Sequence, residues 1–120
     1  MPEFSAECRL CPRLARHLDR VRTEHPGYHG RPVAAFGAQR PRLLVVGLAP
    51  GLHGANRTGR PFTGDRAGVL LYETLHRYGL ASRAVSTDRR DGLKLDRCRI
   101  TNAVKCLPPA NKPTTAEVRR

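Results

Sequence analysis

The 120-residue sequence lacks long apolar runs and has few acidic residues. No stretch approaches the ~20 consecutive apolar residues that a membrane-spanning helix needs, so we expect no membrane association. The N-terminus also lacks a charged segment followed by an apolar one, which argues against a secretory signal and favours a cytoplasmic protein. Without secretion, a disulfide framework is not expected for the four cysteines. Metal binding or redox chemistry is then the first interpretation of these thiols.

The shortage of acidic residues leaves a strongly basic chain. Lysine and arginine total 22 against 10 aspartate and glutamate, which gives a formal net charge of +12 and a pI near 11.0. Such an excess favours a polyanionic partner, and nucleic acid is the commonest one. Arginine in particular can bind a phosphate through two hydrogen bonds. The alternative is that the arginines are simply scattered over a solvated surface.

The N-terminal part of the chain predicts one helix followed by irregular backbone. Leu14, Leu18 and Val21 recur at helical spacing and would share one face of a helix over residues 12–23. Residues 26–41 are dense in proline and glycine, which break regular structure, so we expect an irregular connection there.

The remaining pattern predicts an α/β fold in which helices flank a parallel sheet. The short apolar run at 43–46 is typical of a strand buried on both faces, and residues 100–104 form a plausible second parallel strand. A helix over 66–78 would join them into a right-handed β-α-β unit, with a polar loop at 81–96. The residues expected on the inward face of that helix are Val69, Tyr72 and Leu75, with Leu71 and Tyr78 beside them.

The chain ends where another helix is expected to begin. Residues 107–113 predict a loop, and Thr114 with Glu117 has the form of a capping box at a helix N-terminus. Arg120 follows three residues later, so this helix would have little to gain from forming alone. We therefore expect residues 1–120 to be a single incomplete domain, the N-terminal part of a longer fold.

Residues 47–65 form a glycine-rich segment between the first strand and the second helix. It contains neither the Gly-x-Gly-x-x-Gly pattern nor the Walker A pattern of nucleotide sites, and it is longer than an ordinary strand–helix turn. Glycine lets the backbone approach a ligand closely, and Phe62 offers a flat apolar surface. The segment therefore predicts a site for a planar, hydrogen-bonding ligand beside a phosphate backbone. Its polar side chains include Asn56, Arg57, Thr58 and Arg60.

Three motifs together resemble the iron–sulfur uracil-DNA glycosylase superfamily. Residues 47–65 begin with Gly-Leu-Ala-Pro-Gly and end with Asn-Arg-Thr-Gly-Arg-Pro-Phe-Thr-Gly-Asp, which is similar to the first signature of family 5 (type B). Leu48 stands where family 4 enzymes usually carry an acidic residue. Residues 100–113 resemble the Asn-x-Val-Lys-Cys-x-Pro-Pro-x-Asn stretch, and Cys-x-x-Cys lies at 8–11. The resemblance implies the three-layer α/β/α fold of these enzymes. Its expected parts are residues 1–25 with the Cys-x-x-Cys helix, 42–65 with the strand and glycine-rich loop, and 98–113 with the second strand and the Cys/Pro loop.

The resemblance also implies an active site for a base flipped out of DNA. Asp65 and Asn102 would be catalytic, and Phe62 would stack on the base, an interaction worth ~1–3 kcal/mol. The structural alternatives are an N-cap for Asp65, an ordinary core position for Phe62 and a turn cap for Asn102. The residues expected to bind the substrate are Gly47, Ala49, Pro50, Gly51, Asn56, Arg60, Phe62 and Asn102.

Members of this superfamily hold a [4Fe–4S] cluster through four cysteine thiolates. By position, Cys8, Cys11 and Cys106 match three ligands, and the fourth would lie beyond the end of this chain. Cys98 precedes the second strand and is interpreted as a buried core cysteine. A zinc site made by the same three cysteines, with His17 or His25 as a fourth ligand, is the alternative.

The expected activity is excision of uracil, and of other deaminated bases such as hypoxanthine, from DNA by a cytoplasmic, nucleoid-associated monomer. The His-Pro-Ser loop that follows in the family has no counterpart here, since no histidine follows His76. Two alternatives therefore stay open: a truncated, catalytically impaired nucleic-acid-binding module, and a different phosphate- or nucleotide-binding enzyme.

Overall fold

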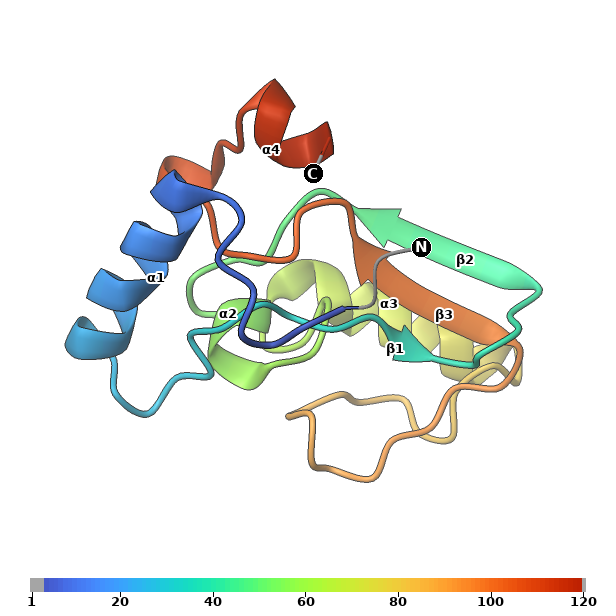
Figure 1. Cartoon of the computed structure of the whole chain (residues 1–120). Helices are drawn as coiled ribbons and strands as arrows, with labels where there is room; N and C mark the ends of the chain where they lie inside the picture. Colours follow the sequence, from blue (N-terminus) through green and yellow to red (C-terminus); the bar gives the residue numbers. More distant parts are fainter. Residues whose placement is uncertain (1–3, 120) are drawn as a thin grey trace.

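The computed structural model describes residues 4–119, which form a small sheet with helices around it (Figure 1). The longer helices are α1 (Pro12–Glu24) and α3 (Arg66–Arg77), and both confirm the helices expected from the apolar pattern. The strands are β1 (Phe36–Gly37), β2 (Leu43–Gly47) and β3 (Cys98–Asn102). The short helices are α2 (Ala55–Thr58), the 3-10 helix η1 (Pro109–Asn111) and α4 (Thr115–Arg119).

β3 lies in the middle of the sheet, whose strand order is β1-β3-β2. β2 pairs with β3 in parallel, as predicted, and α3 lies between them in the chain. β1 runs antiparallel to β3, with Phe36 opposite Ile100, so the α/β class is confirmed but the sheet is mixed. A strand of two residues carries no recognisable alternation, which is why residues 26–41 predict only irregular backbone.

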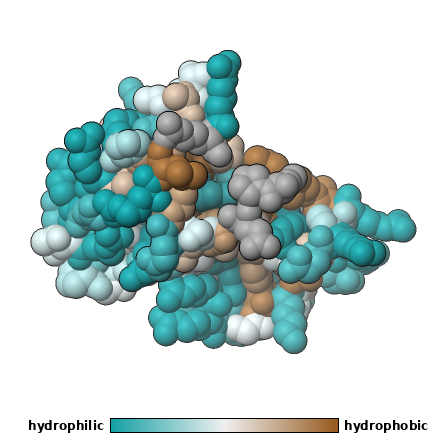
Figure 2. All heavy atoms as spheres, in the orientation of Figure 1, coloured by the Kyte–Doolittle hydropathy of each residue, from teal (hydrophilic) through white to brown (hydrophobic). Residues whose placement is uncertain are grey.

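β2 is an edge strand, and its side chains are more exposed than the sequence predicts. Leu43, Leu44 and Val46 are 44%, 56% and 57% exposed, whereas Val45 packs against the core. The prediction of a strand buried on both faces is wrong for the described residues. The reason is that no strand among residues 4–119 pairs with the outer edge of β2. Figure 2 shows hydrophobic side chains gathered over this part of a mostly hydrophilic surface.

β3 begins and ends two residues before the predicted strand at 100–104. Its alternate residues Cys98, Ile100 and Asn102 are buried, and the first two belong to the same core cluster as Tyr72 and Leu75 of α3. The burial of Cys98 confirms its interpretation as a core cysteine. This packing fixes α3 against one face of the sheet and so positions the loop that precedes it.

The inward face of α3 is centred on Gly68, Tyr72 and Leu75. Tyr72 and Leu75 were expected there, but Val69 and Tyr78 are 65% and 73% exposed, so their expected inward orientation is wrong. A Cβ on Gly68 would lie 2.7 Å from the carbonyl carbon of Phe62 and closer still to its oxygen. The helix therefore turns this glycine toward the loop, and an apolar pattern cannot reveal such a backbone contact.

A second, smaller core lies between α1 and the segment after β3. Leu18 and Val21 of α1 pack with Leu107, and the partly buried Cys106 lies against them. This contact brings the N-terminal segment and the cysteine that follows β3 into one region of the fold.

α4 forms although the sequence gives it little intrinsic stability. The predicted capping box is confirmed, since Thr114 N donates to Glu117 Oε1 at 2.8 Å and Glu117 N donates to Thr114 Oγ1 at 3.2 Å. Arg13 of α1 adds two hydrogen bonds to the Glu117 carboxylate, at 2.7 and 3.0 Å. A tertiary partner thus supplies what the short helix lacks.

Candidate active site

The candidate site begins at the carboxyl end of the two parallel strands. Gly47 is the last residue of β2, and it lies opposite Asn102, the last residue of β3. In α/β sheets, ligands bind in the crevice outside the carboxyl ends of the strands. The two positions predicted from separate motifs are therefore brought together at the expected edge of the sheet.

Phe62 approaches the same place from the glycine-rich loop. A Cβ placed on Gly47 would lie 2.6 Å from Phe62 Cζ and still closer to Asn102 Oδ1. Phe62 is partly buried at the edge of the main core, and its backbone has a φ of 53°. Gly47 is therefore required, because any side chain there would displace the ring and the amide that face it.

Asn102 is a mostly buried residue whose side-chain amide is not used by the described part of the protein. It is 4% exposed, and within residues 4–119 its side-chain amide makes no hydrogen bond. Neither of its amide atoms is among the fully buried side-chain atoms of the described residues that have no partner, so the amide reaches the surface beside the Phe62 ring, where a ligand could contact it. An amide offers both a donor and an acceptor to such a ligand.

Asp65 is an exposed residue at the N-terminus of α3. Its Oδ1 accepts a hydrogen bond from Gly68 N at 2.8 Å, which confirms the N-cap interpretation. Its Oδ2 faces Gly54, where a Cβ would lie only 2.9 Å away. One oxygen is thus engaged in holding the helix, while the carboxylate stays at the surface beside Phe62. The catalytic role of Asp65 stays a prediction.

An open cavity of about 440 Å³, here called the Asp65 cavity, adjoins this carboxylate. Phe62, Gly64 and Asp65 line it from the loop, while Val69 of α3 and Val85 line it from other segments. Tyr72 holds the loop in place by donating its hydroxyl to the Pro61 carbonyl at 2.7 Å. The candidate base-stacking ring and the candidate catalytic carboxylate therefore share one open space.

The other predicted substrate-binding residues of the loop occupy different depths. Pro50 is buried, whereas Ala49 and Gly51 are half-buried between β2 and α2. Asn56 is fully buried, with Nδ2 donating to the Leu52 carbonyl at 3.3 Å and Oδ1 without a partner among the described residues. Substrate contacts by these residues stay predictions.

Arg60 lies inside the protein rather than at the surface. It is 2% exposed, and its Nη1 donates to Asp91 Oδ1 at 2.8 Å and to Ser86 Oγ at 2.9 Å. Its guanidinium also lies 4.2 Å from the centre of the Phe36 ring. The structure therefore gives Arg60 partners within the protein, which tie the loop to the 81–96 segment. Its predicted contact with substrate stays a prediction.

Asp91 is the other end of this internal connection. Burial acts to raise the pKa of its carboxyl, but hydrogen bonds from the backbone of Thr87 and Leu93, together with Arg60, hold that pKa well below its ordinary value. Its Oδ2 accepts from Thr87 N at 2.9 Å and its Oδ1 accepts from Leu93 N at 2.9 Å. The polar segment predicted only as loop is thereby ordered around one buried ion pair.

The three predicted cluster ligands interact across the second core. Burial, followed by the charges of Cys8 and Cys11, raises the pKa of the Cys106 thiol to about 11. Thiolates that repel one another in a partly buried region are a donor set that a cationic group would stabilise. Within residues 4–119, no three His, Cys, Asp or Glu side chains are grouped closely enough to hold a single metal ion. The assignment of these cysteines to a [4Fe–4S] cluster stays a prediction.

An aromatic cluster beside α2 was not predicted from the sequence. His25 stacks on Tyr28 with ring centres 4.6 Å apart, and the Tyr28 hydroxyl is 2.8 Å from His53 Nδ1. These residues join the end of α1 to the glycine-rich loop. Their spacing in the sequence gives no periodic signal that could have grouped them.

Comparison with known proteins agrees with the geometry of the loop and the strand ends. Residues 34–120 match the family described as the uracil DNA glycosylase superfamily. The matched region contains the loop, both strand ends and Cys106, and the chain belongs to the uracil-DNA glycosylase superfamily. No helix of the described residues is long and apolar enough to cross a membrane.

The relatives are named more narrowly. The chain is 54% identical over 92% of its length to a type-5 uracil-DNA glycosylase of Mycobacterium tuberculosis, of which it covers 43%. It is 49% identical over 93% of its length to the type-5 enzyme of Thermus thermophilus, covering 53% of it. A type-4 enzyme of Thermotoga maritima is 34% identical over 92% of the chain, which covers 44% of that enzyme. These identities confirm the predicted resemblance to family 5 over family 4. The chain spans about half the length of the curated relatives it matches.

Proposed function

We propose that the protein is a uracil-DNA glycosylase that hydrolyses the N-glycosidic bond of uracil in DNA. The observation that carries the proposal is the convergence of Gly47, Phe62 and Asn102 at the carboxyl ends of β2 and β3. The names of the type-5 relatives support it. Neither alternative predicted from the sequence gains support from a particular contact of the described residues.

In this proposal the site receives a uracil that has left the base stack. Phe62 stacks on the ring of the base. The Asn102 amide donates to a carbonyl oxygen of the base and accepts from its imide N–H, which uses both functions of a side chain that lacks a partner within residues 4–119. Other deaminated bases that present a carbonyl and an N–H, such as hypoxanthine, could use the same pair of hydrogen bonds.

The reaction breaks the bond between the sugar C1′ and the base nitrogen. The base leaves with the bonding electrons, water adds its oxygen to C1′, and the proton released by that water is taken up by the leaving base. The Asp65 carboxylate, exposed beside Phe62, would orient the water and stabilise the positive charge that develops on the sugar. The products are free base and an abasic site.

Cys8, Cys11 and Cys106 would be three of the four ligands of a [4Fe–4S] cluster. The interaction of their charges in the second core supports this assignment. The cluster would have a structural role, linking the N-terminal segment and α1 to the chain after β3. In this proposal the protein works as a monomer on nucleoid DNA in the cytoplasm.

The activity is tested with a duplex oligonucleotide carrying one uracil, followed by alkaline cleavage of abasic sites. Asp65→Asn is the informative variant, because asparagine caps a helix about as well as aspartate but carries no charge. We expect it to lower the single-turnover rate by about 100-fold or more without changing the far-UV circular dichroism spectrum. Asp96→Asn, an exposed aspartate outside the site, serves as the charge-matched control. Equal rates for wild-type protein and Asp65→Asn would contradict the assignment of Asp65.

The cofactor is tested by anaerobic purification, visible absorbance and iron analysis. We expect a brown protein whose absorbance and iron are lost in Cys106→Ala and kept in Cys98→Ala, since Cys98 belongs to the other core. A colourless protein that contains zinc would contradict the cluster and support the zinc alternative.

A further inference from the structure

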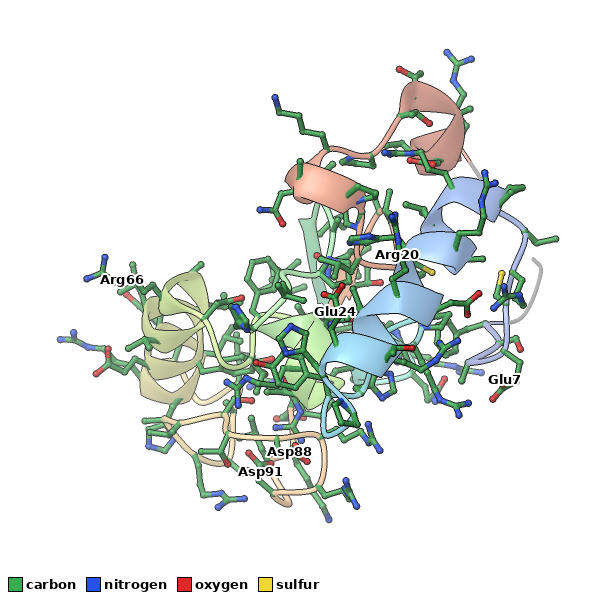
Figure 3. The ribbon with its side chains drawn as sticks, turned by 90° about the vertical axis from the view of Figure 1, so that its left-hand side faces the viewer. Glu7, Arg20, Glu24, Arg66, Asp88 and Asp91 are labelled. Carbon is green, nitrogen blue, oxygen red and sulfur yellow. The ribbon has the colours of Figure 1, made fainter. Side chains whose placement is uncertain are left out.

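A second cavity, of about 520 Å³, is lined from the glycine-rich loop by Arg57. It is called here the arginine cavity, because Arg31, Arg57, Arg89 and Arg90 all line it, against a single acidic side chain, Asp88. These residues come from the 27–31 loop, from α2 and from the 88–90 turn. Figure 3 shows Asp88 and Asp91 together on the loop at the bottom of the view, and Arg66 of α3 at its left edge. The protein thus concentrates positive charge in a hollow next to its candidate active site.

Two of the four guanidiniums have no acidic partner. Arg31 pairs with Glu7 at 2.6 Å, and Arg90 lies 3.8 Å from Asp88, whereas no carboxylate within residues 4–119 forms a salt bridge with Arg57 or Arg89. Both of these arginines are exposed. Arg57 Nε donates to the neutral His53 carbonyl at 2.6 Å, so the positive charge of both guanidiniums stays uncompensated by a carboxylate of the described residues, and two such groups lining one cavity can bind an anion together.

The glycine-rich loop is shaped around these two arginines. Gly64 has a φ of 90°, and a Cβ there would lie 2.5 Å from Arg57 Nη2. Gly59 has a φ of 82°, and a Cβ there would lie 2.8 Å from Arg89 Nη1. At both positions the left-handed backbone and the lack of a side chain let the loop pass directly beneath a guanidinium. The placement of the arginines is therefore built into the motif that also carries Phe62 and Asp65.

His29 orients one of the two arginines. Its Nε2 is 3.1 Å from the Pro32 carbonyl, which can only accept a hydrogen bond, so Nε2 carries the proton and Nδ1 accepts from Arg89. Burial most strongly lowers the pKa of His29, and the charges of Arg89 and Arg31 lower it further, against the raising effect of the Pro32 hydrogen bond. A neutral imidazole can thus hold the Arg89 guanidinium at the cavity wall.

Arg57 connects the arginine cavity with the Asp65 cavity. Its side chain lines the first, while Gly64, which it contacts, lines the second beside Phe62 and Asp65. A DNA strand that delivers a base to Phe62 carries phosphates on both sides of that nucleotide, and contacts to phosphate position the strand without reading its sequence. We propose that the arginine cavity binds a phosphate of the DNA strand next to the nucleotide whose base enters the Gly47–Phe62–Asn102 site, an inference that rests on the proposed function.

The test is the salt dependence of DNA binding, measured by fluorescence anisotropy with a labelled duplex that contains a non-hydrolysable uracil analogue. The variant is Arg57→Gln with Arg89→Gln, and the matched control is Arg40→Gln with Arg77→Gln, two exposed arginines outside the cavity. Loss of one phosphate contact should flatten the plot of log K against log salt by about 1 and weaken binding by about 10-fold at low salt. The control double variant should keep the wild-type slope.

Asp88→Asn is an independent test, because it is expected to strengthen DNA binding rather than weaken it. Asparagine can still accept from Arg90 N, as Asp88 Oδ1 does at 3.0 Å, but it removes the negative charge from the cavity. We expect ~2-fold tighter DNA binding at low salt. Equal slopes for the two double variants, or weaker binding by Asp88→Asn, would overturn the inference while leaving the proposed function intact. Wild-type protein that binds no DNA at any salt would overturn both.

Discussion

The glycine-rich loop has an inner and an outer surface that use the same residue type in opposite ways. On the inner surface, Arg60 is almost completely buried and bound to Asp91 and Ser86. On the outer surface, Arg57 is exposed and has no salt bridge to a carboxylate of the described residues. The two arginines are three positions apart in one motif, yet one holds the loop in place and the other faces the surroundings.

The difference between Arg60 and Arg57 shows that one sequence motif can hold residues that stabilise the fold beside residues that are free to bind a ligand. Buried charge is tolerated only when it is paired and hydrogen-bonded, so Arg60 needs the ordered segment around Asp91. Exposed charge needs no internal partner and remains available for a ligand. The role of a residue in a motif therefore depends on its partner elsewhere in the fold. For Arg60 that partner is Asp91, 31 residues further along the chain.

The largest expected effect comes from removing the inner arginine. Arg60→Met would remove the buried cation 2.8 Å from the Asp91 carboxylate and leave, among the described residues, only the more distant, exposed Arg83 at 3.9 Å, so we expect a loss of ~3–5 kcal/mol in the free energy of unfolding. Arg57→Met, on the outer surface, should change it by less than about 0.5 kcal/mol. Urea unfolding followed by circular dichroism measures both. Similar losses for the two variants would break the comparison between the two surfaces.

A smaller effect should follow from a change in the backbone packing that supports the inner surface. A Cβ on Gly68 would collide with the Phe62 carbonyl group, which is backbone and cannot rotate away. We expect Gly68→Ala to destabilise the protein by ~1–3 kcal/mol, the range for overpacking in a well-packed region. Gly27→Ala is the matched control, since nothing lies within 4 Å of its Cβ position. Urea unfolding again measures both. Equal stabilities for Gly68→Ala and Gly27→Ala would show that the loop moves to accommodate the added Cβ.

Much of the local structure could be predicted from the sequence because its causes are local. The apolar face of α1, the extent of α3, the Asp65 cap and the Thr114–Glu117 box depend on residues within a few positions of one another. The sequence also predicts the parallel pairing of the two strands, although the meeting of Gly47 with Asn102 depends on β3 ending at 102 rather than at 104. For these features, spacing along the chain was sufficient.

The remainder could not be predicted because its causes are distant in the sequence. The burial of Arg60 depends on Asp91, in a segment whose polar composition predicts only loop. The exposure of β2 depends on which strands flank it, and the rotation of α3 depends on the Phe62 backbone. The arginine cavity draws its side chains from segments that have no shared pattern. Each of these features is a tertiary contact rather than a periodicity.

The smallest expected effect concerns the Arg13–Glu117 pair, whose arginine is 40% exposed, and it provides a scale for the pair of Arg60 and Asp91, whose arginine is 2% exposed. Arg13 binds Glu117 at 2.7 Å, and this hydrogen bond is the main reason that the pKa of Glu117 is lowered from 4.5 to about 2. A carboxyl whose pKa is lower in the folded state adds stability above its unfolded pKa, and that contribution disappears as the pH falls from about 4.5 to about 2. Because the Arg13 side chain is 40% exposed and solvent screens its charge, the contribution should be only about 0.5 kcal/mol. Glu117→Gln should therefore be less stable than wild type by about that amount at pH 7 and equally stable near pH 2, as measured by urea unfolding. Glu24→Gln, at an exposed helix position, serves as the control. If Glu117→Gln lowered the free energy of unfolding as much as Arg60→Met, the burial of Arg60 would not explain why its ion pair matters more to stability.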